Sequence, residues 1–460
     1  MDKNLEHFYK KIYFIGIGGI SMSGLAEILK NRGVCVSGSD MKHSDTTDRL
    51  ISLDIPVFIG HKKENITDDI DLVIYTAAVK EDNPELLAAK EKNIKIINRA
   101  ELLGKIMSGY EKSIAVAGTH GKTTTTSMVS EILLHANADP TISVGGILPS
   151  IGGNTKIGNS NYFVAEACEY FDSFLKFNPF IGIILNVEAD HLDYFKDFSH
   201  IQNSFHAFAH RIPKEGTLII YSKIKDLDKI TQDLNCNVLT IGLENDTADW
   251  KAENIIHEEN GKNSFDAVYQ GEIKGRIHLH IPGEHNITNA LCACAAAFTL
   301  GIDMQYIIEG LDNYKGTARR FQYKGTKNGF TIVDDYAHHP TEIKATLEAA
   351  SKIKHNHIWC IFQPHTYSRT YNFLDEFGYA FQNADTIILT DIYAAREKDT
   401  GLIHSKDLLE KIKSHGKNVI YIKEFDSIKQ YVLEHCQKDD LLITMGAGDV
   451  YLIGESILKA

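Results

Sequence analysis

The chain has 460 residues, 43% of them hydrophobic, and its 48 basic and 61 acidic side chains give a formal net charge of −13. This length exceeds what one hydrophobic core can organise and favours roughly three domains. The acidic balance argues against a surface for nucleic acid or anionic membranes, and seven scattered cysteines favour reduced thiols over a disulfide framework.

Two features of the sequence bear on the compartment. No signal peptide precedes Lys11, and no uninterrupted apolar stretch is long enough to span a bilayer. The sequence therefore predicts a cytoplasmic protein that does not insert into membranes. Cys292 and Cys294 fall in an alanine-rich helical run, where we expect them to lie in the core.

The first segment opens with a strand, a glycine-rich turn and a helix. A strand leads into Gly16, Gly18 and Gly19 over KIYFIGIGG. A helix follows over ISMSGLAEILKNRG, and a second strand, VCVSGSD, ends at Asp40. The spacing half-matches the dinucleotide fingerprint, with Ser21 in place of a third Gly or Ala and Asp40 at about the distance of a ribose-binding acid. Alone, this pattern leaves a nicotinamide-dependent enzyme open.

The rest of the first segment continues the alternation of strand and helix. DLVIYTAAV indicates a buried parallel strand, and IKIINRAELLGKIM another strand and helix. Asn83 is expected to cap a helix whose first residue is Pro84. We therefore place one α/β domain over residues 1–109.

The stretch SIAVAGTHGKTTTTSM, residues 113–128, is an apolar strand that stops at Gly118 and a helix that begins near Lys122. The loop between them turns backbone N–H groups and the positive helix end toward one point, which suits a phosphate. Lys122 adds a mobile charge, and the Thr123 hydroxyl is placed to bind Mg²⁺. Val116 stands where the full P-loop pattern has another glycine, so this is a shortened form. The predicted nucleotide-binding residues are Gly118, Thr119, His120, Gly121, Lys122, Thr123 and Thr124.

Two later strands of the central segment end in chemically active side chains. One apolar strand ends on Glu166, and IGIILNVEADHLDYF carries another that ends near Asp190 and His191. Ligands of parallel α/β sheets collect outside the carboxyl ends of the strands, so Glu166 and His191 are candidate metal ligands or water-positioning groups. A solvated loop acid and a hydrogen-bonded structural histidine are the alternatives, since histidine is not a preferred Mg²⁺ ligand.

The central segment then runs through TLIIYS, NVLTIG and RIHLHIPG, which predict further, partly antiparallel strands. EHNITNALCACAAAFTLG follows as a helix that opens at His285, Asn286 and Asn289. The polar stretch DNYKGT marks the next boundary, so we place the central domain over residues 110–315.

The third segment follows the basic pair Arg319 and Arg320. Strands and helices alternate regularly to the C-terminus, which predicts a doubly wound sheet over residues 316–460. Polar clusters follow three of its strands: Asp335, Tyr336, His338 and His339; His365, Tyr367 and Arg369; and Asp391 and Tyr393.

These stretches, in this order and from end to end, resemble the Mur ligase family. They are GIGGISMSGLAEIL with GSD, DNPE, NRAEL, AGTHGKTTTTSM, NVEADHLD, PGEHNITNAL, KGTARRF, VDDYAHHPTEI, FQPHTYSRT, TDIYAAREK and TMGAGDV. The resemblance is to the alanine-adding type and implies ADP-forming, ATP-dependent ligation of L-alanine to UDP-N-acetylmuramate in peptidoglycan precursor synthesis. It also implies an α/β fold of three domains: a Rossmann-like UDP-binding domain, a central P-loop ATPase-type domain, and a doubly wound, Rossmann-like C-terminal domain that closes the site.

The resemblance also implies roles for individual residues. The glycine turn serves the UDP-sugar rather than a nicotinamide cofactor, through Gly16, Gly18, Gly19, Ser39 and Asp40. The implied Mg²⁺ ligands are Thr123, Glu166 and His191. Besides the phosphate loop, the residues implied for ATP are His285, Asn286, Asn289, Arg319, Asp335 and Tyr336. The implied catalytic residues are Lys122, His191, Arg320, His338, His365 and Arg369, the last of which offers a guanidinium fork to the carboxylate of the amino acid.

The chemistry of such a ligation explains why these residue types are needed. A carboxylate is a poor electrophile, so ATP must first convert it into an acyl phosphate. Bringing two anions together is the obstacle, and catalysis of phosphoryl transfer is mostly positioning and charge neutralisation. Lys122, the loop amides and Mg²⁺ are expected to supply both, with Arg320 reaching a phosphate from the third domain.

The chain departs from the family pattern in two places. Several members carry a carbamoylated lysine beyond the histidine of NVEADH, but NSFHAFAH has no lysine and places His206 near that position. We therefore expect no carbamate and leave the ligation of a second metal open. EACEYFDSFL is less acidic than the matching stretch in many relatives, although it keeps Glu166.

Three other functions are alternatives to this one. A recycling ligase would attach a whole tripeptide to the same UDP-sugar. An NAD-dependent oxidoreductase, based on Gly16, Gly18 and Asp40, would leave the phosphate loop and third segment unexplained. A nucleotide-switch module would fit the phosphate loop, yet the chain has no N-K-x-D stretch for guanine. The expected partners are UDP-N-acetylmuramate and L-alanine, without nucleic acid, for a monomer or weak homodimer.

Overall fold

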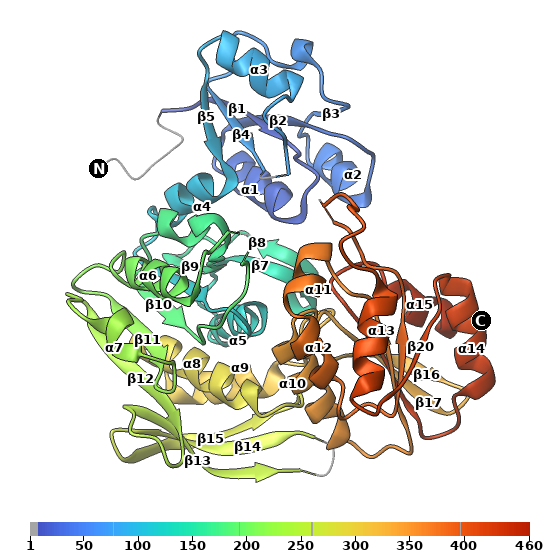
Figure 1. Ribbon diagram of the computed structural model, residues 1–460. Helices are drawn as coiled ribbons and strands as arrows, with labels where there is room; N and C mark the ends of the chain where they lie inside the picture. Colours follow the sequence, from blue (N-terminus) through green and yellow to red (C-terminus); the bar gives the residue numbers. More distant parts are fainter. Residues whose placement is uncertain (1–7, 77, 193, 259–260, 396) are drawn as a thin grey trace. The chain divides into compact units, whose positions relative to one another are not determined.

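The computed structural model describes residues 8–76, 78–192, 194–258, 261–395 and 397–460. The chain divides into two compact units, one made of residues 1–250 and 292–310, the other of residues 251–291 and 311–460. The described strands form three sheets (Figure 1). Each unit is taken in turn.

The first sheet is parallel throughout and has the strand order β3-β2-β1-β4-β5. Its strands are β1 (Lys11–Ile15), β2 (Cys35–Asp40), β3 (Val57–Ile59), β4 (Leu72–Tyr75) and β5 (Lys95–Asn98). Its helices are α1 (Ile20–Asn31), α2 (Asp45–Ser52), η2 (Lys63–Asn65), α3 (Pro84–Glu91) and α4 (Arg99–Met107). The predicted parallel α/β domain is therefore confirmed in this part of the first unit.

Helices cover both faces of the first sheet. Leu25 of α1 and Leu102 of α4 belong to one hydrophobic core, whereas Leu86 of α3 packs with Tyr13 and Val73 in another. Figure 1 shows α3 on one side of the strands and α1 on the other. Because strand order reverses between β1 and β4, a crevice is expected outside their carboxyl ends, next to the glycine turn.

The first unit contributes seven neighbouring strands to the second sheet, in the order β12-β11-β10-β6-β9-β7-β8. They are β6 (Lys112–Ala117), β7 (Thr141–Leu148), β8 (Gly153–Lys156), β9 (Tyr162–Glu166), β10 (Ile181–Ile184), β11 (Thr217–Tyr221) and β12 (Asn237–Leu243). Only β8 runs antiparallel to its neighbour among these strands. The helices that follow them are α5 (Lys122–His135), η3 (Pro149–Ile151), η4 (Tyr170–Lys176), α6 (Phe198–Ala209) and α7 (Leu227–Thr231).

The two parts of the first unit pack closely because glycines remove side chains from the contact. A Cβ atom added to Gly104 in α4 would lie 2.0 Å from the carbonyl oxygen of Lys176 at the end of η4. One added to Gly24 in α1 would lie 2.0 Å from the hydroxyl of Thr155 in β8. One continuous hydrophobic core accordingly joins α1 and α4 to the central strands and α6.

Two helices, α8 (His285–Thr299) and α9 (Met304–Asn313), span the boundary between the units. The helix predicted to open at His285 is therefore confirmed. Cys292 and Cys294 of α8 are fully buried, as their alanine-rich context predicted.

The second unit holds β13 (Trp250–His257) from Lys251 onward, together with β14 (Asn263–Tyr269) and β15 (Glu272–Leu279). β14 and β15 pair antiparallel, which confirms the partly antiparallel strands predicted here.

The third sheet lies wholly in the second unit and has the order β16-β17-β21-β18-β19-β20. Its strands are β16 (Gln322–Lys327), β17 (Phe330–Asp335), β18 (Ile358–Phe362), β19 (Thr386–Leu389), β20 (Asn418–Tyr421) and β21 (Leu441–Met445). Its helices are α10 (Pro340–Ser351), α11 (Tyr367–Asn372), α12 (Leu374–Ala380), α13 (Ser405–Ser414), α14 (Phe425–His435) and α15 (Tyr451–Lys459).

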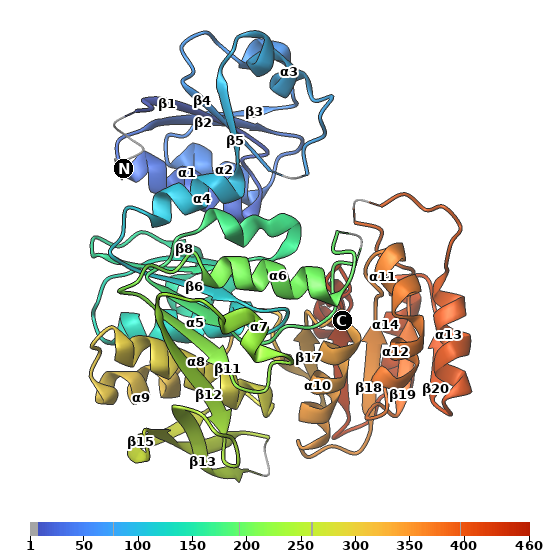
Figure 2. The ribbon, with the colours of Figure 1, turned by 60° about the vertical axis from the view of Figure 1, so that its left-hand side comes forward.

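Helices cover both faces of this sheet as well (Figure 2). Leu347 of α10 and Leu408 of α13 belong to one core, while Val432 of α14 and Ile453 of α15 belong to a second. The predicted doubly wound sheet is confirmed. Within the described ranges, no helix combines the length and apolar character needed to cross a membrane.

Candidate active site

The phosphate loop has the geometry predicted from its sequence. β6 ends at Ala117, and α5 begins at Lys122. Gly121 is the N-cap of α5 in the left-handed conformation, with φ 82°, and Gly118 has φ 141°. Both backbone conformations strain any residue with a Cβ atom, so glycine is what lets the chain turn from β6 into α5 here. Thr123 and Thr124 lie buried in the first helical turn.

Asn186, just beyond β10, fixes the shape of this loop. Its Oδ1 accepts from the backbone N–H of His120 at 2.8 Å, and its amide donates to the His120 carbonyl at 3.1 Å. The Thr119 N–H donates to the Asn186 carbonyl at 3.2 Å, and the Glu188 N–H donates to the Thr119 hydroxyl at 2.9 Å. The adjacent strands β6 and β10 thus carry two loops that brace each other.

Lys122 is held by a buried carboxylate. Its ammonium lies 3.0 and 3.2 Å from the two carboxylate oxygens of Glu169, which is only 3% exposed. It also donates to the carbonyl oxygens of Gly118 and of Thr119. Burial is the largest single influence and lowers the pKa of Lys122, but the charge and hydrogen bond of Glu169, together with Cys168 and Glu166, outweigh it, so the net pKa is raised. Lys122 is therefore a charged ammonium at neutral pH.

Further acidic and imidazole groups gather around this pair. Nε2 of His191 lies 3.9 Å from Glu169 Oε1 and 3.7 Å from Asp190 Oδ2. Glu166, the last residue of β9, accepts from the backbone N–H of Gly145 in β7 at 2.6 Å. The structure thus brings His191 to Glu169, the partner of the phosphate-loop lysine, as the strand-end argument predicted. The roles proposed for Glu166 and His191 stay predictions.

Glu169 and Asn186 are site residues that the sequence argument did not single out. Glu169 stands in ACEYF, three positions after Glu166, and Asn186 opens the NVEAD stretch. The signal available for Glu169 was that it is a second acidic residue, three positions after the acid that ends the strand. Asn186 carried no signal of its own, because its function is to hydrogen-bond the backbone of a loop that is remote in sequence.

Oxygen donors suited to Mg²⁺ are present beside the loop. Thr123 supplies a hydroxyl in the first turn of α5, and Glu166 and Glu169 supply carboxylates on the segment after β9. Both carboxylates act electrostatically on Lys122. Hydroxyl and carboxylate oxygens are the ligands that Mg²⁺ takes in proteins, so these residues fit that ion.

The glycine turn after β1 is bound to the end of β2. The backbone N–H groups of Gly16 and Ile17 both donate to the Ser39 carbonyl, at 2.8 and 2.9 Å, and the N–H of Gly18 donates to Asp40 Oδ2 at 2.9 Å. Gly19 is the N-cap of α1. The structure therefore gathers Gly16, Gly18, Gly19, Ser39 and Asp40 at the expected crevice. Asp40 organises the glycine turn itself, a contact that its spacing alone did not reveal.

A buried network behind Ser39 stabilises this arrangement. Glu85 is fully buried, and its carboxylate accepts hydrogen bonds from Ser39, at 2.6 Å, and from Tyr13 and Asn65, at 2.9 and 2.6 Å. His61 Nδ1 lies 2.8 Å from the same carboxylate. Burial, followed by the Glu85 charge, raises the pKa of Tyr13, so that its hydroxyl stays protonated and donates.

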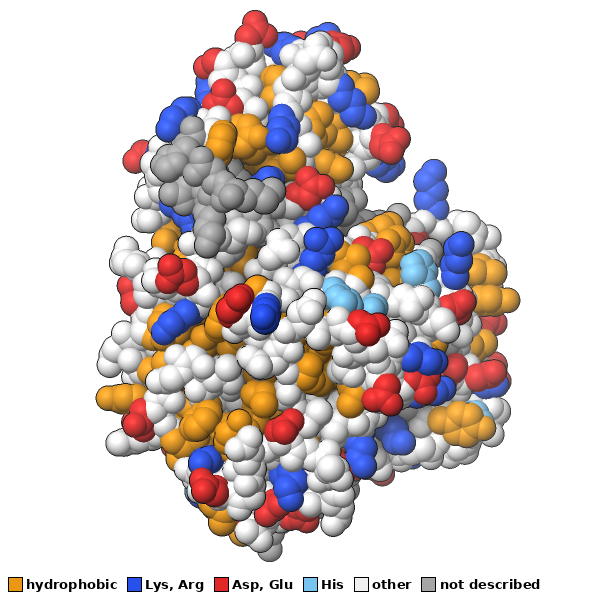
Figure 3. Space-filling view, turned by 90° about the vertical axis from the view of Figure 1, so that its left-hand side faces the viewer, with side chains coloured by type: hydrophobic (Ala, Val, Ile, Leu, Met, Phe, Trp, Pro, Cys, Tyr) orange, Lys and Arg blue, Asp and Glu red, His pale blue; other side chains and the backbone are white. Residues whose placement is uncertain are grey.

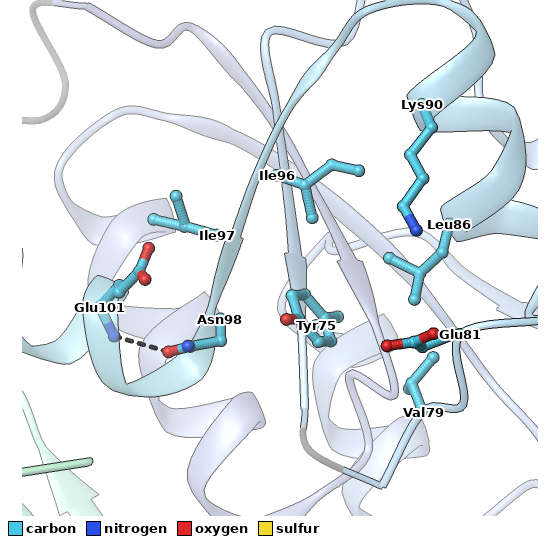
Figure 4. A pocket seen from close by; sticks show the side chains of 9 residues that line it. All are labelled: Tyr75, Val79, Glu81, Leu86, Lys90, Ile96, Ile97, Asn98 and Glu101. Atoms are coloured by element: carbon cyan, nitrogen blue, oxygen red, sulfur yellow. Dashed lines mark hydrogen bonds between the residues drawn. The ribbon is translucent and has the colours of Figure 1, made fainter. Parts of the chain in front are cut away.

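A hollow lies beside these elements, along edge strand β5 and helix α3 (Figure 4). Tyr75 lies between Asn98 and Glu81 in the view, and Asn98 accepts the backbone N–H of Glu101. The residues that line the hollow are Tyr75, Val79, Glu81, Leu86, Lys90, Ile96, Ile97, Asn98 and Glu101. None of them is a predicted site residue.

In the second unit, Arg319 and Arg320 flank the end of β17 in different ways. Arg319 donates to Asp334 at 3.1 Å and to the Gly446 carbonyl at 2.6 Å, with its guanidinium carbon 4.9 and 4.6 Å from the ring centroids of Tyr336 and Tyr451. Arg320 lies 5.1 Å from the Tyr336 ring. The predicted contacts of Arg319 and Tyr336 with ATP stay predictions, and the structure shows both residues engaged within the domain.

Asp335 is buried at the end of β17. Its carboxylate oxygens accept from the backbone N–H groups of Phe321 and Ala337, each at 2.7 Å. Burial raises the pKa of Asp335 to about 6, although the positive charge of Arg320 and the two N–H donors oppose the rise.

The second polar cluster gathers at the carboxyl ends of β18 and β19. Arg369 Nη1 lies 3.2 Å from His365 Nδ1, and the His365 ring stacks on Tyr393 with centroids 5.7 Å apart. The His338 ring lies 5.7 Å from that of His365. His339 instead caps α10 and packs on Phe373. His338, His365, Arg369 and Tyr393 are thus together, whereas Asp391 bonds to Tyr421 and Tyr367 begins α11.

The residues that open α8 are engaged by one another. The Asn286 amide donates to the Pro282 carbonyl at 2.7 Å, and Asn289 donates to Asn286 Oδ1 at 3.1 Å. Both asparagines are buried, at 6% and 4% exposed. His285 precedes them as the first helical residue. Their predicted place near adenine stays a prediction.

Charges on the molecular surface are mixed. On the face in Figure 3, Lys and Arg side chains are interspersed with Asp and Glu rather than gathered into one basic region.

Comparison with protein families finds three adjoining matches. The model described as "Mur ligase family, catalytic domain" matches residues 11–111, "Mur ligase middle domain" matches 116–297, and "Mur ligase, glutamate ligase domain" matches 319–448. The matches together extend over most of the chain.

Individual relatives match over their full lengths. A UDP-N-acetylmuramate–L-alanine ligase of Lachnospira eligens is 55% identical over 97% of this chain and 98% of its own, and one of Acetivibrio thermocellus is 53% identical over 98% and 96%. Among solved structures, the UDP-N-acetylmuramate-alanine ligase MurC of Thermotoga maritima is 29% identical, covers 98% of each chain and superposes with a TM-score of 0.81. A murein peptide ligase of Psychrobacter arcticus, at 24% identity and a TM-score of 0.73, shows the same fold.

Proposed function

This chain belongs to the Mur ligase family, and from that premise we propose that it ligates L-alanine to the carboxylate of UDP-N-acetylmuramate. The proposal includes cleavage of ATP to ADP and phosphate through an acyl phosphate, as a step in peptidoglycan precursor synthesis. One observation carries it: a relative named for this activity is 55% identical over 97% of the chain. The phosphate loop and its buried charges support the same chemistry.

The phosphate loop accounts for the activation step. An attacking carboxylate and the γ-phosphate repel each other, and the barrier falls when fixed positive groups neutralise the transferring phosphoryl oxygens. Lys122 remains protonated in its buried position, and the α5 N-terminus adds oriented N–H groups. Asn186 holds the loop backbone at Thr119 and His120 in place, so little reorganisation of the loop is needed during the reaction.

Mg²⁺ is the proposed cofactor, held by Thr123 with Glu166, His191 and the additional carboxylate Glu169. Bound there, it would neutralise charge on the β- and γ-phosphates of ATP. The proteins of this family are ligases, and the oxygen donors beside the loop suit this ion. For the UDP-sugar, the proposed binding residues are Gly16, Gly18, Gly19, Ser39 and Asp40 at the reversal point of the first sheet.

The polar cluster of the second unit is proposed to receive the amino acid. Arg369 and His365 lie 3.2 Å apart, so one carboxylate would meet both a guanidinium and an imidazole. His338 lies beside them, and Arg320 is proposed to contact a phosphate. The adenine is assigned to His285, Asn286 and Asn289 at the start of α8.

The alternatives have less support. The curated relatives at 51–55% identity are named as alanine ligases. Among the solved structures, the alanine ligase superposes with a TM-score of 0.81, against 0.73 and 0.61 for two peptide ligases. An oxidoreductase would not use the phosphate loop, and a nucleotide switch would not need the third sheet.

The test is a reconstituted ligation. Purified protein is mixed with ATP, Mg²⁺, UDP-N-acetylmuramate and one amino acid at a time, and phosphate release, nucleotides and UDP-linked products are followed by chromatography. We expect L-alanine to give the highest kcat/KM, with ADP as the nucleotide product. Stoichiometric AMP would overturn the acyl-phosphate mechanism, and preference for a tripeptide over L-alanine would move the assignment to the recycling reaction.

The proposal also places the enzyme in the cytoplasm, where both the nucleotide and the UDP-sugar are made, as a monomer or weak homodimer. Sedimentation at micromolar concentration checks the second part. A stable larger assembly would contradict it.

A further inference from the structure

A group of aromatic side chains lies directly beside the proposed catalytic centre. We call Tyr170, Phe171 and Tyr194 the aromatic cluster. The rings of Tyr170 and Phe171 are 4.3 Å apart between centroids, and those of Phe171 and Tyr194 are 4.8 Å apart. Tyr170 also stacks on His191, with centroids 4.3 Å apart and an interplanar angle of 25°. The cluster therefore touches a residue of the candidate active site.

Two consecutive residues at this cluster have an unusual backbone conformation. Phe171 and Asp172 both have left-handed conformations, with φ 54° and 52°. Such conformations suit glycine or asparagine and strain a bulky aromatic residue, and they persist where the surroundings hold them. Here the carboxylate of Asp172 accepts hydrogen bonds from Tyr194, at 2.6 Å, and from Ser204.

This arrangement leaves Phe171 outside the hydrophobic core. Its side chain is 55% exposed, whereas Phe174, one turn later, is fully buried. Tyr194 is fixed by its bond to Asp172, which is the largest cause of the rise of its pKa to about 12. Phe171 thus exposes an apolar ring to solvent and adopts a strained backbone conformation. The packing of the core requires neither.

The position of the cluster indicates what the rings contact. Tyr170 follows Glu169, the partner of Lys122, so the cluster is one residue from the group that holds the phosphate-loop lysine. In UDP-N-acetylmuramate, the reacting carboxylate is joined to the pyranose ring through one carbon and an ether oxygen. A carboxylate placed beside Lys122 and His191 must therefore bring the sugar ring close to the aromatic cluster.

We propose that the aromatic cluster, and Phe171 in particular, is the surface on which the pyranose ring of the acceptor packs. The C–H face of a pyranose is apolar, and it complements the negative face of an aromatic ring. The cluster would then orient the sugar so that its carboxylate points at the γ-phosphate. This inference rests on the proposed function and adds a residue that sets substrate specificity.

The test measures binding with and without the sugar. Calorimetry gives the Kd of UDP-N-acetylmuramate and of UDP for wild type, Phe171→Asn and Phe171→Tyr, without ATP. Asparagine tolerates the left-handed backbone, so the variant removes the ring while keeping the fold. We expect Phe171→Asn to weaken UDP-N-acetylmuramate binding by about three- to tenfold, the range for one aromatic contact, with UDP unchanged and Phe171→Tyr close to wild type.

Two further variants make the result decisive. Tyr306→Ala removes another exposed ring, which lies on α9 against His135 at the opposite end of α5 from the phosphate loop, and should leave both Kd values unchanged. Phe171→Gly also suits the left-handed backbone and replaces the asparagine variant should that one unfold early in a thermal scan.

The possible outcomes separate this inference from the proposed function. If wild type ligates L-alanine but Phe171→Asn and Phe171→Gly bind both ligands as wild type does, the sugar contact is overturned while the function stands. Equal weakening of UDP and UDP-N-acetylmuramate would also overturn it, because a merely structural role predicts that pattern. Failure of wild type to ligate L-alanine, with UDP-N-acetylmuramate still bound more tightly than UDP, would instead overturn the function.

Discussion

Single residues of the candidate site differ in how far the sequence reveals them. Lys122, Thr123 and the two loop glycines could be predicted, because the phosphate loop is one continuous stretch whose chemistry is local. Glu169 could not, since its role depends on β9 lying next to β6, a neighbour relation that arises only in the folded sheet. The sequence predicted that Asp40 lies at the end of the strand after the glycine turn, but only the folded structure shows its bond to the Gly18 N–H.

The first prediction concerns Lys122. Lys122→Ala should lower kcat by roughly a hundredfold or more, the usual effect of removing a group that stabilises transition-state charge. UDP-N-acetylmuramate binding, measured by calorimetry, should change little, because its UDP part is proposed to contact the glycine turn of the first sheet, and a charge that acts on the moving phosphoryl group contributes mainly to kcat. Near wild-type turnover in this variant would remove the phosphate loop from the mechanism.

The second prediction concerns Arg369, which lies 3.2 Å from His365. Arg369→Lys should raise the KM for L-alanine by about tenfold or more and leave the KM for ATP nearly unchanged, because an ammonium cannot reproduce the planar two-donor fork. Steady-state kinetics with each substrate varied gives both constants. Equal rises in the two KM values would contradict the assignment of Arg369 to the amino acid.

The third prediction concerns the charge of Asp335. Its pKa is about 6 in the fold and 3.8 as the ordinary value, so the folded protein binds this proton more tightly than the unfolded chain. The stabilising contribution of the protonated carboxyl is therefore complete below pH 3.8 and is lost as pH rises through 6. Carbon-13 NMR of labelled aspartate should show a midpoint near 6.

A substitution checks the sign of that shift. Because the positive charge of Arg320 opposes the rise, Arg320→Met should move the Asp335 midpoint upward. Asp139, whose bond to Lys156 lowers its pKa to about 2, serves as the internal control and should not move. A midpoint below 4.5 in wild type would contradict the burial argument.

At the scale of elements, helix starts were predicted well and irregular turns were not. Asn83 caps α3 with Pro84 as its first residue, and α5 begins at Lys122. These starts depend on a few adjacent residues, which sequence patterns capture. The left-handed turn at Phe171 has no glycine to mark it, because bonds to Asp172 from a distant tyrosine and serine hold it.

The fourth prediction tests one of these helix starts. Asn83 accepts from the N–H groups of Glu85 and Leu86, at 2.9 and 3.2 Å. Asn83→Ala should lower the free energy of unfolding by about 1 kcal/mol, the typical value of an N-cap. Urea unfolding measures the change, and Asp82→Ala, an exposed neighbour, is the control. Identical midpoints for the two variants would show that the cap contributes nothing.

At the scale of the whole molecule, the order of strands within each sheet was beyond the sequence argument, although the three-domain α/β class was predicted. The alternation of strand and helix indicates parallel sheets, but it does not say that β1 lies between β2 and β4, or β6 between β10 and β9. Nor did any pattern single out the glycines that let α4 meet η4.

The fifth prediction concerns that packing. In Gly104→Ala the new methyl group would meet the Lys176 carbonyl, so η4 must shift, and the variant should lose about 1–3 kcal/mol of stability by overpacking. Urea unfolding gives the value, with Lys105→Ala, exposed on the same helix, as the control. If Gly104→Ala were more stable than wild type, η4 would have to move away from the new methyl group without a loss of stability.

The pair of Lys122 and Glu169 has a consequence for how nucleotide enters. Glu169 acts as a built-in counter-ion, so the ammonium is already satisfied and offers little to a stray inorganic anion. A polyphosphate that bound without a metal ion would place negative charge beside the Glu169 carboxylate and leave that carboxylate without a positive partner. If a polyphosphate arrived with a divalent cation, Lys122 would turn to the phosphate and the Glu169 carboxylate would be free to bind the cation. The loop would then select its ligand by charge balance, binding anion and cation together.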